Sequence, residues 1–259
     1  MFRNIYPVFE AKKVLRIEML ENLRDYPRTL FDIEYQEYSD GILYGCRLKA
    51  ADKELTVLPG IILFKGVPYF MEEPYMVPCD ALGKLTYLKV CFTDKEVGIG
   101  REVYRGQICL DEQEPDAGRE LELGRFKLQP GARLRTEYVD LSDYDTEFDT
   151  VNRIHVPYAA PGRPVIWPQI LRCFAGEMMH RRLRDPWDCA FCMHCMQTRE
   201  AMSYEAVRAY LNAKLEQEGE YTSEQTYHAL LQILREAEGD RPRRTDRQAG
   251  QSVDYDLTI

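Results

Sequence analysis

Three cysteines at regular spacing, Cys189, Cys192 and Cys195, are the residues of this sequence best suited to chemistry. Two residues separate each cysteine from the next, and this spacing lets neighbouring thiolates converge on one zinc ion or iron-sulfur cluster. A closed tetrahedral zinc site needs a fourth ligand, for which only His180, His194 or a distant cysteine is available. The same spacing also places the three cysteines on one side of an α-helix. A structural zinc site and a plain helix side both stay open as interpretations.

A second group consists of five carboxylates between residues 140 and 149, which could hold calcium. No glycine occurs where an EF-hand loop turns, and no glutamate closes such a loop. The carboxylates alternate with Tyr144, Thr146 and Phe148, which is typical of an edge strand whose acidic face lies in water. We therefore expect a solvated strand here. The five residues are Asp140, Asp143, Asp145, Glu147 and Asp149.

The sequence lacks the motifs of the common enzyme classes, namely G-x-S-x-G, H-E-x-x-H and the Walker A segment. Val97-Gly98-Ile99-Gly100 supplies half of a dinucleotide-binding fingerprint, and we interpret it as a loop among strands. The four histidines are spread along the chain, so no nucleophile can be paired with a base. We expect a protein that is not an enzyme. An enzyme on a β-barrel would need a pocket that combines Asp143 or Asp145 with His155.

The composition is typical of a folded protein, with 259 residues, of which 45% are hydrophobic and 30% charged. This length suits two domains of ordinary size. The net charge of −9 disfavours nucleic acid as a partner, because binding to phosphates requires a basic surface. No apolar run reaches the roughly 18 to 20 residues that span a bilayer, and the first residues lack a signal peptide's apolar core. We expect a cytoplasmic protein without direct membrane insertion.

The N-terminal region is predicted to begin with a short amphipathic helix over residues 14–25, which Tyr26-Pro27 ends. From Thr29 the period changes to two. Phe31 and Ile33 alternate with polar residues, which predicts the first strand. Residues 1–27 therefore form an N-terminal lead-in in this interpretation, and a β-rich domain occupies residues 28–160.

The β-rich domain is predicted from short hydrophobic segments that turn residues separate. Gly41 follows Ser39-Asp40 in one such turn, and Pro59-Gly60 and Pro130-Gly131 have the order that a type II turn requires, with glycine at the position of positive φ. This spacing predicts an antiparallel sandwich or barrel. The expected strands lie near 42–48, 54–58, 61–64, 67–71, 85–92, 104–111 and 120–128.

A helical domain is predicted over residues 161–238, after a segment with four prolines between residues 157 and 168. Ser203 is a good N-cap for one helix, and Thr222 and Gln225 have the spacing of a capping box for the next. Short connections favour an antiparallel bundle. Residues 239–259 are expected to form a disordered tail because apolar residues are few. The expected helices lie near 167–182, 186–199, 204–217 and 223–237.

The order of these parts resembles the TssK family of type VI secretion baseplate subunits, together with similar proteins of contractile injection systems and phage-like particles. The resemblance is carried by the lead-in, by the segments Tyr38-Ser-Asp-Gly-Ile-Leu-Tyr-Gly45 and Leu58-Pro-Gly-Ile61, and by the helical region that follows. It implies a β-sandwich shell followed by a helical bundle, in a trimeric adaptor whose shell docks on the baseplate wedge. It transfers no catalytic residue.

The sequence thus leads us to expect an α+β fold and a non-enzymatic structural or adaptor subunit of a contractile injection system or phage-tail-like baseplate. The β-domain would bind other baseplate or injection-system proteins, and the helical domain would form a homo-oligomer, with a trimer favoured. The alternative is a zinc-binding regulatory or nucleic-acid-associated protein that uses Cys189, Cys192 and Cys195. Apart from that zinc ion, no cofactor is expected.

Overall fold

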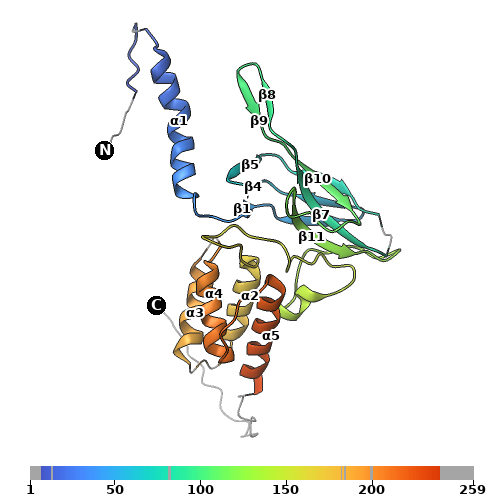
Figure 1. The fold of residues 1–259 in the computed structure, drawn as a ribbon. Coiled ribbons are helices and arrows are strands. Elements are labelled where there is room, and N and C mark those ends of the chain that lie inside the picture. Colours follow the sequence, from blue (N-terminus) through green and yellow to red (C-terminus); the bar gives the residue numbers. More distant parts are fainter. Residues whose placement is uncertain are drawn as a thin grey trace, which may run out of the picture.

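The computed structural model describes residues 7–239 except residues 13, 81–82, 182, 184 and 199–200. The predicted disordered tail lies almost entirely outside the described residues. Figure 1 shows the β-strands on one side of a helical bundle, and helix α1, Ile17–Glu34, standing apart from both. The α+β class and the order of antiparallel sheets before helices are confirmed, whereas closure into a sandwich or barrel stays a prediction.

The described strands form four antiparallel sheets, with strand orders β1-β4-β5, β2-β3-β6, β10-β7-β11 and β8-β9. The predicted strands over 67–71 and 85–92 are confirmed to the residue. The bounds are β1 Gly41–Gly45, β2 Leu48–Ala51, β3 Glu54–Val57, β4 Gly60–Phe64, β5 Val67–Met71, β6 Tyr75–Pro78, β7 Leu85–Phe92, β8 Glu96–Gly98, β9 Arg101–Val103, β10 Gly106–Asp111 and β11 Glu120–Lys127.

Helix α1 is longer than predicted, because it continues through Pro27 to Glu34. The strand expected from Thr29 is therefore wrong. Proline removes one backbone donor and crowds the carbonyl four residues earlier, which in a packed helix interior costs about 3 kcal/mol. In α1 that carbonyl belongs to Leu23, on a helix with no buried residue, so water can satisfy it.

The turn residues differ from the prediction at one position. Gly131 has a positive φ of 85°, whereas Gly60 does not have a positive φ, so the type II turn predicted at Pro59-Gly60 is wrong. Gly60 is needed for space instead, because a Cβ atom there would lie 2.4 Å from the backbone nitrogen of Cys46. Gly41 meets a similar constraint, since a Cβ atom there would lie 2.5 Å from the nitrogen of Ala159.

The four predicted C-terminal helices are confirmed within a few residues of their expected ends. The Ser203 hydroxyl accepts a hydrogen bond from the Ala206 N–H. Thr222 and Gln225 form the reciprocal capping box, with side-chain acceptors at 2.9 and 3.2 Å. The bounds are α2 Pro168–Met179, α3 Pro186–Gln197, α4 Tyr204–Leu215 and α5 Ser223–Gly239.

One continuous apolar cluster runs from Ile42 in β1 to Leu234 in α5. The segment over 151–166, which includes most of the predicted proline-rich boundary, contributes many fully buried residues to it. Domain boundaries usually lie in exposed linkers. This segment is buried instead, and it packs in the same apolar cluster as the β-strands and the bundle. The division at residue 160 stays a prediction. Among the described residues, none of the helices is both long and apolar enough to cross a bilayer.

Candidate protein-binding surfaces

Helix α1 carries a face of apolar side chains that the described residues leave uncovered. Leu23 and Leu30 are each 58% exposed, and Ile33 is 61% exposed. Steps of four, three, four and three residues from Met19 keep five apolar side chains on one side of the helix. We call this the α1 apolar face, and it consists of Met19, Leu23, Tyr26, Leu30 and Ile33.

The opposite side of α1 is charged, with Glu18, Glu21, Asp25, Arg28 and Asp32 in sequence. An amphipathic helix of this kind normally lays its apolar side on a core. In this structure no residue of α1 is buried, and Figure 1 shows the helix projecting away from the helical bundle. The α1 apolar face therefore has the chemistry of a protein-binding surface.

The β8-β9 hairpin is a second projecting element with exposed apolar residues. Val97 is 76% exposed, and Ile99 at the turn is fully exposed. Gly100, with a φ of 72°, completes the turn before β9. Because a strand follows this segment, and a dinucleotide fingerprint needs a helix there, the segment does not form a dinucleotide site.

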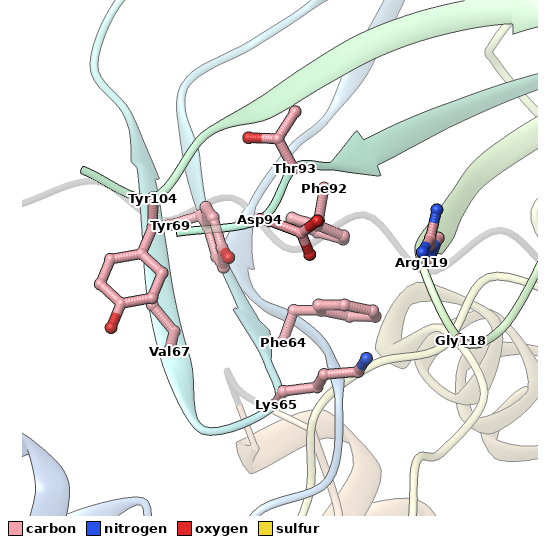
Figure 2. A pocket seen from close by; sticks show the side chains of 10 residues that line it. All are labelled: Phe64, Lys65, Val67, Tyr69, Phe92, Thr93, Asp94, Tyr104, Gly118 and Arg119. Atoms are coloured by element: carbon pink, nitrogen blue, oxygen red, sulfur yellow. The ribbon is translucent and has the colours of Figure 1, made fainter. Parts of the chain in front are cut away.

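A pocket of about 630 Å³ lies where the β4-β5 turn meets the end of β7. Its wall is aromatic, because Phe64 and Phe92 stack with their ring centroids 4.0 Å apart and Tyr69 packs at 4.6 Å from Phe92. Burial raises the pKa of the Tyr69 hydroxyl, so the hydroxyl stays neutral. Figure 2 shows Tyr104 on one side of the pocket and Arg119 on the other.

The cations of this pocket lack acidic partners. Lys65 and Arg119 both line it, and neither makes an ion pair with any of the described residues. Lys65 extends its ammonium group over the Phe64 ring, 5.4 Å from the centroid. Asp94 is the single carboxylate among the lining residues. The pocket therefore has a net positive lining in a protein whose net charge is −9. The sequence places Lys65 only between the expected strands 61–64 and 67–71 and gives no sign of the pocket.

The cysteine cluster lies on helix α3. Cys189 is exposed, whereas Cys192 and Cys195 are buried, so the three side chains do not share one environment. Burial raises the pKa of each buried thiol to about 12, which keeps both protonated and unreactive. The described part of the chain contains no group of three or more His, Cys, Asp or Glu side chains that could hold a metal ion. The zinc hypothesis gains no support from this geometry.

The acidic stretch does not form the expected edge strand. Leu141–Asp145 is a 3-10 helix, and Asp140 caps it by accepting from the Asp143 N–H. The Asp143 carboxylate forms a double hydrogen bond at 2.5 Å with the Arg135 guanidinium, which holds the pKa of that carboxyl well below its usual range. The acidic residues here hold local structure together.

The same stretch attaches the helical bundle to the β-strands. The Tyr227 hydroxyl of α5 donates to the Leu141 carbonyl at 2.8 Å, and the Leu141 N–H donates to Glu177 of α2 at 2.6 Å. A pocket beside Asp145 is lined by α5 residues, including Tyr227 and His228, but not by His155. The acid and histidine pocket required for the enzyme interpretation is therefore not formed there.

Helix α3 exposes large apolar residues, in contrast to α4 and α5. The apolar stripes of α4 and α5 are buried inside the bundle. On α3, by contrast, Trp187 is 56% exposed, Met193 47% and Met196 54%. Large exposed aromatic and Met side chains are typical of interfaces. We call Trp187, Met193 and Met196 the exposed α3 residues; at 3.6 residues per turn they lie around the helix and not on one face.

Comparisons with known proteins give matches among solved structures alone. No protein-family model matches the sequence, and no curated protein matches it. One similar chain belongs to the cryo-electron microscopy structure of the type VI secretion system TssK-TssF-TssG baseplate subcomplex, with a TM-score of 0.44, 11% identity, and coverage of 91% of this chain and 99% of that chain. Another is a crystal structure of TssK, with a TM-score of 0.42, 9% identity, and coverage of 91% and 72%.

Proposed function

We propose that this protein is a non-enzymatic adaptor subunit of a contractile injection system or phage-tail-like baseplate, and that it works in the cytoplasm. In this proposal it binds other baseplate proteins through the α1 apolar face and the β-strands, and forms a homo-oligomer through the helical bundle. The observation that carries the proposal is the uncovered α1 apolar face. The baseplate setting rests on the order of parts in the sequence.

The α1 helix would be marginal without a partner. Most helical stability in proteins comes from packing of an apolar face and not from helix propensity, and α1 has no buried residue. Burial of Leu23, Leu30 and Ile33, each now more than half exposed, would contribute roughly 1 kcal/mol per side chain. A partner that covers the α1 apolar face would therefore stabilise both the helix and the complex.

The α1 apolar face can be tested with a matched pair of variants. Leu23→Glu/Leu30→Glu places two negative charges on the face, and we expect capture of baseplate proteins to fall at least tenfold. Arg28→Glu changes the net charge by the same amount on the opposite side of α1, and we expect it to retain capture. Affinity purification from the native host with quantitative mass spectrometry measures both.

Because α1 has no buried residue, neither variant should shift the melting temperature by more than about 1 °C. This control separates loss of binding from loss of folding. Retention of the captured baseplate proteins by Leu23→Glu/Leu30→Glu would show that the α1 apolar face is not the binding surface. Capture of no baseplate protein by the unaltered chain would contradict the proposed function itself.

The proposed homo-oligomer has a separate test on the exposed α3 residues. We expect light scattering of the unaltered protein to give three times the chain mass. Trp187→Glu/Met193→Glu should shift the mass toward that of one chain, because charges at an apolar interface must be desolvated. His228→Glu/Gln232→Glu adds the same formal charge on an exposed part of α5 and should leave the mass unchanged. A strict monomer at high concentration would contradict oligomerisation.

A further inference from the structure

The aromatic pocket at the β4-β5 turn has a specific chemical requirement. Its wall of Phe64, Phe92 and Tyr69 favours large apolar side chains. Its two cations, Lys65 and Arg119, form no ion pair with the described residues and favour carboxylates. Figure 2 shows Lys65 below the stacked rings and Arg119 to their side. A suitable ligand therefore presents apolar and acidic groups within a few ångströms of each other.

The chain itself contains a segment with this chemistry. In residues 253–257 the order is Val253, Asp254, Tyr255, Asp256, Leu257. In an extended backbone, successive side chains point to opposite sides. Val253, Tyr255 and Leu257 would then share one side, and the two carboxylates would share the other.

We propose that residues 253–257 of one copy bind in the aromatic pocket of a neighbouring copy. The apolar side of the segment would contact Phe64 and Phe92, and the two Asp carboxylates would pair with Lys65 and Arg119, whose long side chains can reach around an extended strand. The pairing places two negative charges beside two unpaired positive ones. The pocket lining holds these two cations against one carboxylate, Asp94.

A neighbouring copy is the source of the segment because of where helix α5 ends. Figure 1 shows α5 running away from the β-strands, so that the C-terminal end of α5 lies at the end of the bundle opposite the sheets. To reach its own pocket, the chain would have to run back along α5, whose 17 residues span about 26 Å, and then past the sheets. The 14 residue steps from Gly239 to Val253 extend at most about 50 Å, so about half of that reach is used along α5 alone.

The test uses a fluorescein-labelled peptide of residues 250–259 and the full chain carrying Asp254→Lys/Asp256→Lys, which disables its own segment. We expect the peptide to bind, as measured by fluorescence anisotropy. Adding Lys65→Glu/Arg119→Glu to that chain should weaken binding at least tenfold. Lys49→Glu/Lys53→Glu makes the same change in charge on β2 and the adjoining turn, and should leave binding unaltered.

The peptide also has its own variants. Tyr255→Ser/Leu257→Ser should weaken binding at least tenfold, and a peptide with Asp254→Lys/Asp256→Lys should regain binding to the chain with Lys65→Glu/Arg119→Glu. Equal binding of a scrambled peptide would assign the pocket to acidic partners in general and overturn the proposal. Absence of binding would overturn it as well.

The source of the segment is tested by mixing two full chains. The chain with Lys65→Glu/Arg119→Glu keeps the segment but lacks the charges of the pocket, and the chain with Asp254→Lys/Asp256→Lys keeps the pocket but lacks the charges of the segment. We expect the first chain to displace the labelled peptide from the second. If it does not, while the unaltered chain excludes the peptide, the segment occupies its own pocket and the intermolecular proposal is wrong. Only one part of the inference, that the segment comes from a neighbouring copy, rests on the proposed homo-oligomer. Peptide binding involves neither α1 nor a baseplate protein, so its failure would leave the proposed function standing.

Discussion

Replacing Lys89 with methionine is expected to lower the free energy of unfolding by about 3 kcal/mol at pH 7. Lys89 lies in the middle strand of the β10-β7-β11 sheet, and its side chain is 1% exposed. Its ammonium group lies 2.9 Å from Glu120 and 3.1 Å from Asp111, and donates to the Gln113 carbonyl at 3.2 Å. Methionine would fill the space but leave the Glu120 carboxylate, 19% exposed, without its cation.

The contribution of Lys89 to the free energy of unfolding depends on pH, and the pKa shifts of Lys89 and Glu120 give the direction of this dependence. Burial alone lowers the pKa of Lys89, but its hydrogen bonds to Glu120 and Asp111 outweigh burial and raise it. Burial raises the pKa of Glu120, and its bond to Lys89 outweighs that effect and lowers it. A raised lysine pKa stabilises the fold below about pH 10, and a lowered glutamate pKa stabilises it above about pH 4. The Lys89→Met deficit should therefore be largest between these values and shrink outside them.

Thermal unfolding would show this deficit as a fall of about 6 to 12 °C in melting temperature, since 1 kcal/mol corresponds to about 2 to 4 °C in a chain of this size. Lys84→Met is the control, because Lys84 forms an exposed pair with Glu112, and exposed pairs contribute little. The double variant Lys89→Met/Glu120→Met should recover part of the loss, because no buried charge remains unpaired. A Lys89→Met protein as stable as the unaltered one would show that the pair contributes nothing net.

The sequence predicts β7 and the C-terminal helices well, because their signals are local. The Ser203 cap and the Thr222 and Gln225 capping box lie within one turn of the helices they begin. Hydrophobic periodicity likewise needs only neighbouring residues. These elements are found within a few residues of where they were expected.

The two wrong element predictions came from local patterns that suit more than one structure. Phe31 and Ile33 alternate with polar residues as in a strand, yet they lie in α1, where Ile33 also completes the four-and-three spacing from Met19. In the acidic stretch, Asp140 and Asp143 alternate with other residues but hydrogen-bond to local backbone and to Arg135. Side chains of this type often favour turns over strands in this way.

The pocket was beyond sequence reasoning for a different physical reason. Lys65 and Arg119 are 54 positions apart in the chain, and they meet because the β4-β5 turn approaches the chain entering β11 (Figure 2). The Lys89 partners likewise depend on the registers of β10 and β11 with β7. Sheet register is set by non-local packing, so neither site has a signal in a single sequence.

Replacing Gly41 with valine is the other change with a large expected effect, a loss of about 3 kcal/mol or more in the free energy of unfolding. A Cβ atom at Gly41 would lie 2.5 Å from the Ala159 nitrogen and 2.8 Å from the Pro157 carbonyl oxygen. These are backbone atoms, so no side-chain rotation relieves the overlap. Ile42 also donates to the Pro157 carbonyl and accepts from Ala159, both at 2.9 Å, and displacement of either segment would break these bonds.

The expected loss for Gly41→Val is measurable as a fall in melting temperature of about 6 °C or more. Gly176→Ala is the control: Gly176 lies in α2, and a Cβ atom there meets nothing within 4 Å, so alanine should stabilise the helix by up to about 1 kcal/mol. The two glycine variants thus move stability in opposite directions if packing against residues 157–159 is what Gly41 provides. Because this contact ties β1 to the buried segment that leads into the bundle, Gly41→Val should also lower the protection of residues 150–166 against hydrogen exchange. Stability and protection equal to those of the unaltered protein would mean that this close approach does not hold the two parts together.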